Sequence, residues 1–193
     1  ASDVYKRQVY VMVVGETSRA CNWALYGYER ETNPGLSGIG GLTAFSHVLT
    51  ESNTTHKSVP MLLSPVSASS FDSIYYQKGI ITAFKEAGYQ TAFFSNQRYN
   101  HSFIDFFGKE ADTYDFIKED VGDSNYNPSD NELLKLVAKE LGKGVSRQFI
   151  VLHTYGSHFN YKERYPAEQA FFLPDMPVDA EVKYKDNLIN ACL

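Results

Sequence analysis

Several polar side chains of this 193-residue chain directly follow short apolar runs, where strands are expected to end. Glu16 comes just after the run Tyr10–Val14, and its carboxylate is a hard oxygen donor that suits a divalent metal ion. A glutamate at this point can equally pair with Arg19 or hold a turn. The sequence therefore allows a metal ligand at Glu16, with a structural ion pair as the open alternative.

Thr55 lies in the first turn of a helix predicted over Thr54–Leu63. A hydroxyl there sits at the positive end of the helix dipole, which favours an alkoxide and attracts phosphoryl oxygens. Threonine becomes an effective nucleophile when a base or a metal activates it. The alternative is that Thr54 or Thr55 only caps the helix, and spacing alone favours that cap.

Two histidines and an amide pair follow later apolar runs. His153 and His158 flank Gly156 and could converge on a ligand or a metal, or each imidazole could simply be hydrogen-bonded. Asn96 and Gln97 follow a separate run. Because ligands of open α/β sheets bind beyond the carboxyl ends of the strands, these clusters predict a site, although they do not specify a reaction.

The elements that would position these residues alternate along the chain. Apolar runs rich in β-branched residues predict strands, and amphipathic segments predict helices. Such alternation favours an α/β fold, with a mostly parallel sheet covered on both faces. Strands are expected at 10–14, 43–49, 90–94 and 148–152, helices at 54–63 (with Pro60 inside), 78–87 and 131–141 (with Asp130 as N-cap), and a surface loop at 120–129.

The composition excludes several classes of protein. Hydrophobic residues make up 43% of the chain, which is typical of a globular protein. The formal net charge of −5 argues against binding nucleic acid through a broad basic surface. The two cysteines, Cys21 and Cys192, cannot make a disulfide-rich scaffold or an all-cysteine zinc site. The longest aliphatic run is too short to span a membrane.

Both ends of the chain look foreign to the protein. Residues 2–8 resemble the translation of a common sequencing adaptor, and residues 192–193 match the start of the same adaptor read on the opposite strand. We therefore expect residues 1–8 and 192–193 to be artefacts and residues 9–191 to be a partial catalytic domain of a longer protein.

Three segments, taken together, resemble the phosphoethanolamine transferases of the sulfatase and alkaline-phosphatase superfamily. The first is Val13–Ala20 followed by Leu25–Pro34, the second is Thr54–Pro60, and the third is Val151–His158 followed by Arg164–Pro166. They occur in the order of the family and extend over nearly all of residues 9–191. The resemblance implies a three-layer α/β/α sandwich of the sulfatase type, incomplete at its C-terminus.

The resemblance also implies roles for individual residues. Glu16 matches a zinc ligand, and Thr55 matches the nucleophile, which is a zinc ligand too. His158 matches a histidine that binds substrate or a second zinc ion close to the transferred phosphoryl group. Asn96, Gln97 and His101 fall where the family binds the phosphoethanolamine group.

Some features of the family differ here or are absent. Glu51 and Met61 stand where the family usually has the two cysteines of a disulfide around the nucleophile. The remaining zinc ligands of the family, an Asp-His pair, do not occur, nor do the membrane-anchoring helices. With two of about four ligands, the chain alone is expected to bind zinc weakly and to be inactive.

The implied activity of the full-length protein is transfer of phosphoethanolamine from phosphatidylethanolamine to lipopolysaccharide through a phospho-threonine intermediate. The resemblance places such an enzyme in the inner membrane of a Gram-negative bacterium, with its catalytic domain in the periplasm. A phosphoglycerol transferase is the nearest alternative, and a non-catalytic domain that binds a lipid or glycan is another. A true sulfatase is excluded because no Cys/Ser-x-Pro-x-Arg motif surrounds Thr55.

Overall fold

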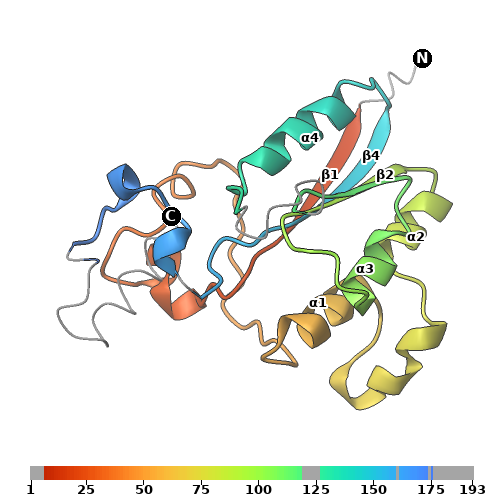
Figure 1. Ribbon diagram of the computed structural model, residues 1–193, viewed down its shortest axis with the longest axis horizontal. Helices are drawn as coiled ribbons and strands as arrows, with labels where there is room; N and C mark the ends of the chain where they lie inside the picture. Colours follow the sequence, from red (N-terminus) through yellow and green to blue (C-terminus); the bar gives the residue numbers. More distant parts are fainter. Residues whose placement is uncertain (1–6, 119–126, 160, 174, 176–193) are drawn as a thin grey trace. The chain divides into compact units, whose positions relative to one another are not determined.

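The computed structural model describes residues 7–118, 127–159, 161–173 and 175 of the chain (Figure 1). Its contacts divide it into two compact units. Residues 1–14 and 50–154 belong to the first unit, and residues 15–49 and 155–193 belong to the second. Most of the predicted loop at 120–129 lies outside the described residues.

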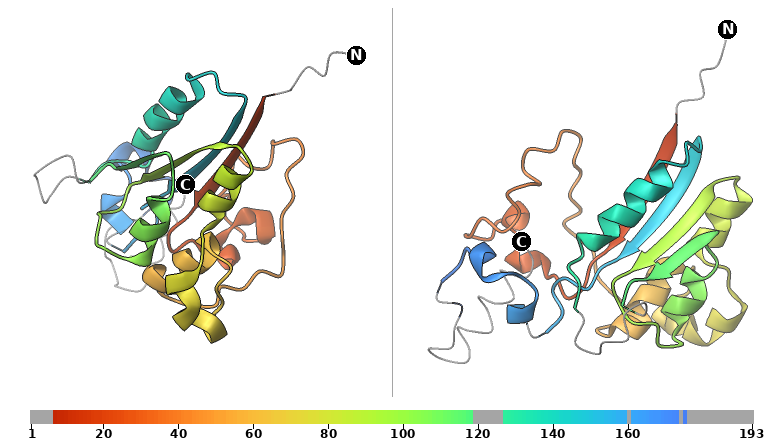
Figure 2. Two further views of the ribbon diagram at one scale, coloured as in Figure 1. Left: turned by 90° about the vertical axis from the view of Figure 1, so that its right-hand side faces the viewer. Right: turned by 45° about the horizontal axis from the view of Figure 1, so that its top comes forward.

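The first unit is built on a parallel sheet of four strands in the order β1-β4-β2-β3. Three helices cover one face of this sheet and a fourth covers the other (Figures 1 and 2). The predicted three-layer sandwich is therefore confirmed. The elements are β1 (Gln8–Val14), α1 (Thr55–Leu63), α2 (Ile80–Glu86), β2 (Gln90–Ser95), α3 (Phe103–Gly108), β3 (Thr113–Phe116), α4 (Glu132–Leu141) and β4 (Arg147–His153).

Alternating side chains of the central strands fill two separate cores. Phe93 of β2 and Val151 of β4 point toward α1, α2 and α3, where they pack with residues such as Leu63 and Phe107. The intervening residues of the same strands pack against Leu133 of α4. Because both faces of the sheet are covered, these strands are apolar along almost their whole length. Their continuous apolar runs are the pattern that predicts them from the sequence.

The three predicted helices form close to their predicted positions, and Pro60 lies inside α1 as expected. The predicted N-cap of α4 is wrong by one residue. Asn131 occupies the N-cap position, while the Asp130 carboxylate accepts a hydrogen bond from the Asn96 side chain at 2.7 Å. An aspartate that can cap a helix has bound a more distant amide instead.

The predicted strand at 43–49 does not form, because this segment has no strand to pair with in the described part of the chain. Its apolar residues are exposed, with Phe45 at 71%, Val48 at 73% and Leu49 at 94%. The fourth strand is instead β3, which pairs with β2. Strand formation depends on a pairing partner more than on local preference. Strand β3 has only four residues, so its sequence shows no clear apolar run or alternation.

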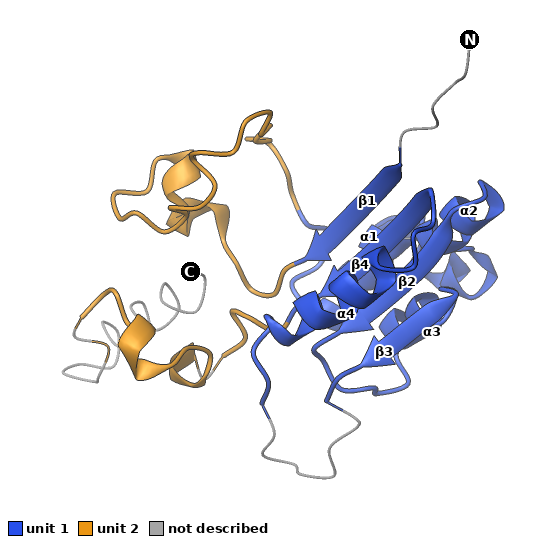
Figure 3. Ribbon diagram, turned by 90° about the horizontal axis from the view of Figure 1, so that it is seen from above, with its two compact units in different colours: residues 1–14, 50–154 blue, residues 15–49, 155–193 orange. Residues whose placement is uncertain are grey.

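Where the structure describes it, the second unit consists of loops and short 3₁₀ turns (Figure 3). Thr32 is almost fully buried in it, at 1% exposure. Its hydroxyl donates to the Asn22 carbonyl at 2.7 Å and accepts from the Ala24 backbone N–H at 2.9 Å. The conformation of the 20–26 segment therefore depends on a side chain from the Leu25–Pro34 motif.

Within the described residues, none of the helices combines the length and the apolar character needed to cross a bilayer.

Candidate functional site

The carboxyl ends of three neighbouring strands meet at one edge of the sheet, as the sequence predicted. His153 of β4 lies in register with Val14 of β1 and with Ser95 of β2. The Thr154 backbone N–H and hydroxyl both donate to the Val14 carbonyl, at 3.0 and 3.1 Å. The Asn96 backbone N–H donates to the His153 carbonyl at 2.9 Å. This edge is therefore cross-linked by hydrogen bonds beyond the regular strand ladder.

His153 belongs to the interior of this edge. Its side chain is 1% exposed, and its Nδ1 atom lies 3.2 Å from the Ser95 hydroxyl. The same hydroxyl accepts a hydrogen bond from the Gln97 backbone N–H at 3.1 Å. His153 is therefore buried and hydrogen-bonded, and convergence of its imidazole with that of His158 on a ligand or a metal stays a prediction.

Asn96 and Gln97 lie at the same edge, and their side-chain amides contact the protein itself. The Asn96 amide nitrogen donates to the Pro128 carbonyl at 2.9 Å as well as to Asp130. The Gln97 amide nitrogen donates to the Thr154 carbonyl at 3.1 Å. The buried Asn96 Oδ1 atom has no hydrogen-bond donor among the residues that the structure describes. Substrate binding by this pair stays a prediction.

Thr55 is the first residue of α1, and it is half-buried. Thr54 holds the N-cap position, but its side chain makes no capping hydrogen bond; its hydroxyl lies 3.2 Å from that of Ser52. The hydroxyl of Thr55 is thus at the positive end of the α1 dipole, the position that the sequence predicted. The capping alternative does not apply to the Thr54 side chain.

Two of the predicted residues, Glu16 and His158, belong to the second unit. Glu16 is 8% exposed, and its carboxylate accepts a hydrogen bond from the Thr17 hydroxyl at 2.7 Å. Thr17 has a left-handed backbone, with φ of 51°, which is uncommon outside glycine. The imidazole of His158 stacks on Tyr155, with ring centroids 4.5 Å apart.

The donor set of the predicted site fits zinc in chemical type but is incomplete. A carboxylate from Glu16 and a hydroxyl from Thr55 are oxygen donors that zinc accepts, and a typical site has about four ligands. Among the described residues, no three His, Cys, Asp or Glu side chains gather closely enough to hold a metal ion. Zinc binding by Glu16 and Thr55 stays a prediction.

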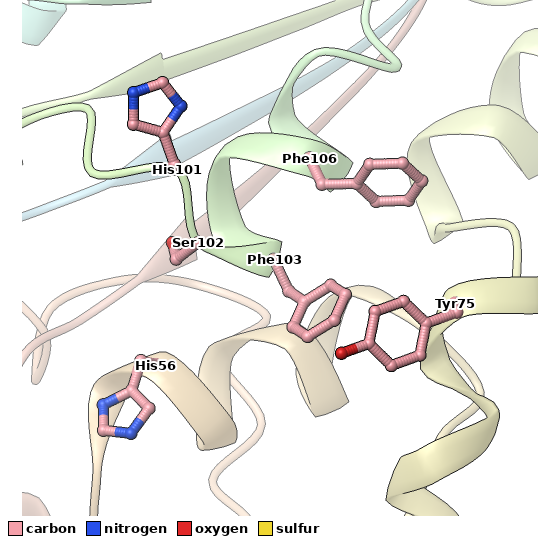
Figure 4. Close-up of a pocket in the computed structure, with 6 residues that line it drawn as sticks. All are labelled: His56, Tyr75, His101, Ser102, Phe103 and Phe106. Atoms are coloured by element: carbon pink, nitrogen blue, oxygen red, sulfur yellow. The ribbon is translucent and has the colours of Figure 1, made fainter.

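His101 lines a pocket of about 540 Å³ beside the first turn of α1 (Figure 4). Its backbone is left-handed, with φ of 60°, and its ring packs edge-on against Tyr99 at 4.6 Å. The buried carboxylate of Asp105 holds this turn on both sides, because it accepts from the Asn100 N–H at 2.8 Å and from the Ser102 N–H at 3.2 Å. Asp105 therefore holds the backbone of the turn that carries His101.

Replacing Asp105 by alanine is expected to reduce the free energy of unfolding by about 2–3 kcal/mol, since it removes the acceptor of the Asn100 N–H and leaves the Ser102 N–H only its weaker contact with the Asn100 side chain. Urea titration followed by circular dichroism measures this loss. Asp105→Asn keeps one acceptor oxygen and should recover part of it. Asp72→Ala, which alters an exposed aspartate, should change stability by less than about 0.5 kcal/mol. Equal effects of Asp105→Ala and Asp72→Ala would contradict this role.

Asp105 and the aromatic side of the pocket were not predicted from the sequence. A signal for Asp105 was present, since Ser102 and Asp105 form a capping box at the start of α3, with the S-x-x-D pattern typical of helix starts. No sequence pattern indicated that Tyr75 and Phe103 would meet, because they come from separate helical segments.

The sulfatase family matches residues 8–191 of the chain. The chain is 29% identical over 169 residues to the phosphoethanolamine transferase CptA of Salmonella typhimurium, a match covering 84% of the chain and 29% of CptA. It is 34% identical over 158 residues to the phosphoethanolamine transferase OpgE of Escherichia coli, covering 79% of the chain and 29% of OpgE. The chain thus spans less than a third of the length of these relatives.

Solved structures agree with these matches. The zinc complex of the C-terminal periplasmic domain of EptC from Escherichia coli superposes with a TM-score of 0.88 at 25% identity, over 97% of the chain and 56% of that domain. The integral membrane protein EptA from Neisseria meningitidis, a lipooligosaccharide phosphoethanolamine transferase, superposes with a TM-score of 0.82 at 26% identity, over 97% of the chain and 36% of EptA. The chain belongs to the sulfatase family, and within it the chain resembles the phosphoethanolamine transferases.

Proposed function

We propose that the chain is part of the catalytic domain of a phosphoethanolamine transferase. The full-length enzyme moves phosphoethanolamine from phosphatidylethanolamine to a lipopolysaccharide acceptor, either lipid A or the core. The observation that carries this proposal is the position of Thr55 at the N-terminus of α1, in a chain similar to phosphoethanolamine transferases over most of its length.

The reaction has two steps in this proposal. The hydroxyl oxygen of Thr55 attacks the phosphorus of phosphatidylethanolamine, and the bond from phosphorus to the glycerol oxygen breaks. Diacylglycerol leaves with the proton that the hydroxyl loses, and phosphoethanolamine stays bound to Thr55. An oxygen of the acceptor then attacks the same phosphorus, the bond from phosphorus to the Thr55 oxygen breaks, and Thr55 takes up a proton from the acceptor or from water. Such a covalent intermediate predicts ping-pong kinetics.

The protein stabilises the charge that develops in these steps. The positive end of the α1 dipole lies at Thr55 and favours both the ionised hydroxyl and the phosphoryl oxygens. Glu16 and Thr55 would hold zinc, which supplies positive charge to the nucleophile and to the phosphoryl group. Asn96, Gln97, His101 and His158 bind the phosphoethanolamine group in this proposal.

The partners and the location follow from the same proposal. Lipid substrates require the full-length enzyme to work at a membrane, and its catalytic domain lies in the periplasm, attached to the inner membrane by an anchor. Similarity to the transferase CptA, to the periplasmic domain of EptC and to the membrane protein EptA supports this location.

The test is to trap the intermediate. The full-length protein is incubated with phosphatidylethanolamine without an acceptor, and its peptides are analysed by mass spectrometry. The proposal expects phosphoethanolamine on the peptide that contains Thr55, and it expects a chelator to prevent this and zinc to restore it. Phosphoglycerol on the same peptide after incubation with phosphatidylglycerol alone would favour a phosphoglycerol transferase. No adduct with either lipid, in protein saturated with zinc, would overturn the proposal.

A further inference from the structure

The pocket beside α1 has two chemically different sides. Figure 4 shows His56, His101 and Ser102 on one side and Tyr75, Phe103 and Phe106 on the other. These six residues come from α1, from α3 and the turn before it, and from the 3₁₀ segment Ala68–Tyr76, all within the first unit. The pocket is therefore amphipathic, and it does not depend on the placement of the second unit.

The apolar side is held rigidly at its base and is open at its rim. Phe103 packs edge-on against Tyr75 at 5.0 Å and against Phe71 at 6.2 Å, and it contacts the main core. The rim residues Tyr75 and Phe106 are 70% and 51% exposed. Exposed aromatic rings around a hollow lined mostly by carbon can bury a hydrocarbon group away from solvent.

The polar side carries hydrogen-bonding groups suited to an anion. It presents two imidazoles and the hydroxyl of Ser102, and none of the six described lining residues has a carboxylate. His56 follows Thr55 directly in the chain, so this side of the pocket adjoins the proposed nucleophile. The left-handed backbone of His101, which Asp105 holds, keeps the second imidazole at this rim.

We propose that this pocket binds the start of an acyl chain of a glycerophospholipid whose phosphoryl group lies at Thr55. The aromatic side contacts the hydrocarbon, and the imidazoles face the phosphate and ester oxygens. The pocket combines a polar side that has no carboxylate with an aromatic side. This combination favours a glycerophospholipid, because such a lipid has an anionic group directly next to its chains. The inference rests on the proposed function in naming the donor lipid, and it adds the part of the enzyme that recognises the chain.

The first test compares donors that differ only in their chains. The full-length enzyme is assayed with dioctanoyl phosphatidylethanolamine and with glycerophosphoethanolamine, which has no chains, at one acceptor concentration. The variant Tyr75→Ser/Phe106→Ser should lower kcat/KM for the dioctanoyl donor by about tenfold, the scale of a lost methylene contact or two. Its kcat/KM for glycerophosphoethanolamine should stay within about twofold of the parent value.

Leu134→Ser is the matched control for this variant. Leu134 is 57% exposed, similar to Phe106, but it lies on α4 at the opposite face of the sheet. It should leave both donors unaffected. If the double variant lowers kcat/KM for both donors by the same factor, or for neither, the chain-binding role of the pocket is wrong.

A second test needs no transfer activity. Tyr75→Trp and Leu134→Trp variants of the chain are titrated with a short-chain phosphatidylethanolamine brominated in its chains, below its micelle concentration. Bromine quenches tryptophan on contact, and Trp23 gives the same background in both variants. Quenching at position 75 alone supports the pocket even if no phosphoethanolamine adduct forms on Thr55. Equal quenching at both positions, or none, overturns the inference even if the transfer reaction is established.

Discussion

Replacing Thr55 by alanine is expected to abolish phosphoethanolamine transfer by the full-length enzyme, with a loss of at least about a thousandfold in kcat. The physical reason is that the variant lacks the oxygen that forms the covalent bond to phosphorus. Neither the positive end of α1 nor a bound metal can replace that bond-forming atom. Transfer of labelled phosphoethanolamine to lipopolysaccharide measures the effect, with diacylglycerol release as a separate readout of the first step.

Thr54→Ala is a closely matched control for this substitution. Thr54 is the adjacent residue, is half-buried like Thr55, and its side chain makes no capping hydrogen bond. Its removal should change transfer by less than about threefold and stability by less than about 1 kcal/mol. Thr55→Ser keeps a hydroxyl and should retain measurable turnover. Full transfer by Thr55→Ala, or equal losses in Thr54→Ala and Thr55→Ala, would show that Thr55 is not the nucleophile.

Replacing Phe93 by alanine is expected to cost about 3–5 kcal/mol of unfolding free energy, a large part of the roughly 5–15 kcal/mol that domains possess. Phe93 is 0% exposed in the central strand β2, and its ring lies 5.8 Å from that of Phe116. The backbone of Gly108 approaches this ring so closely that a Cβ atom there would lie 2.6 Å from it. Surroundings packed this tightly cannot collapse fully into the space that alanine leaves.

Urea titration of the chain, followed by circular dichroism, measures the loss in Phe93→Ala. Phe45→Ala is the control, because Phe45 is 71% exposed and its truncation should cost less than about 0.5 kcal/mol. A change below about 1 kcal/mol for Phe93→Ala would mean that the described core does not stabilise the fold. Phe93 lies two residues before Ser95, so partial unfolding of β2 should also disturb the strand ends around His153.

The predicted and the unpredicted elements differ in how far local sequence encodes them. Strands β1, β2 and β4 and helices α1, α2 and α4 were predicted because their apolar residues recur with the period of the element and must be buried. The segment 43–49 has similar residue types but no strand beside it in the described part of the chain, so it stays exposed. Strand β3 was missed for the opposite reason, since pairing with β2 compensates for its short length.

The candidate site divides in the same way. The sequence by itself determined which residue types are available for chemistry and their order. It also determined that Thr55 lies in the first turn of a helix, because these properties depend on neighbours along the chain. Only the tertiary structure showed that Asn96 binds Asp130 and that Asp105 holds the turn carrying His101. It alone showed that aromatic rings from separate helical segments form one side of a pocket beside α1. Contacts between residues far apart in sequence follow from how the layers pack, and no local pattern encodes them.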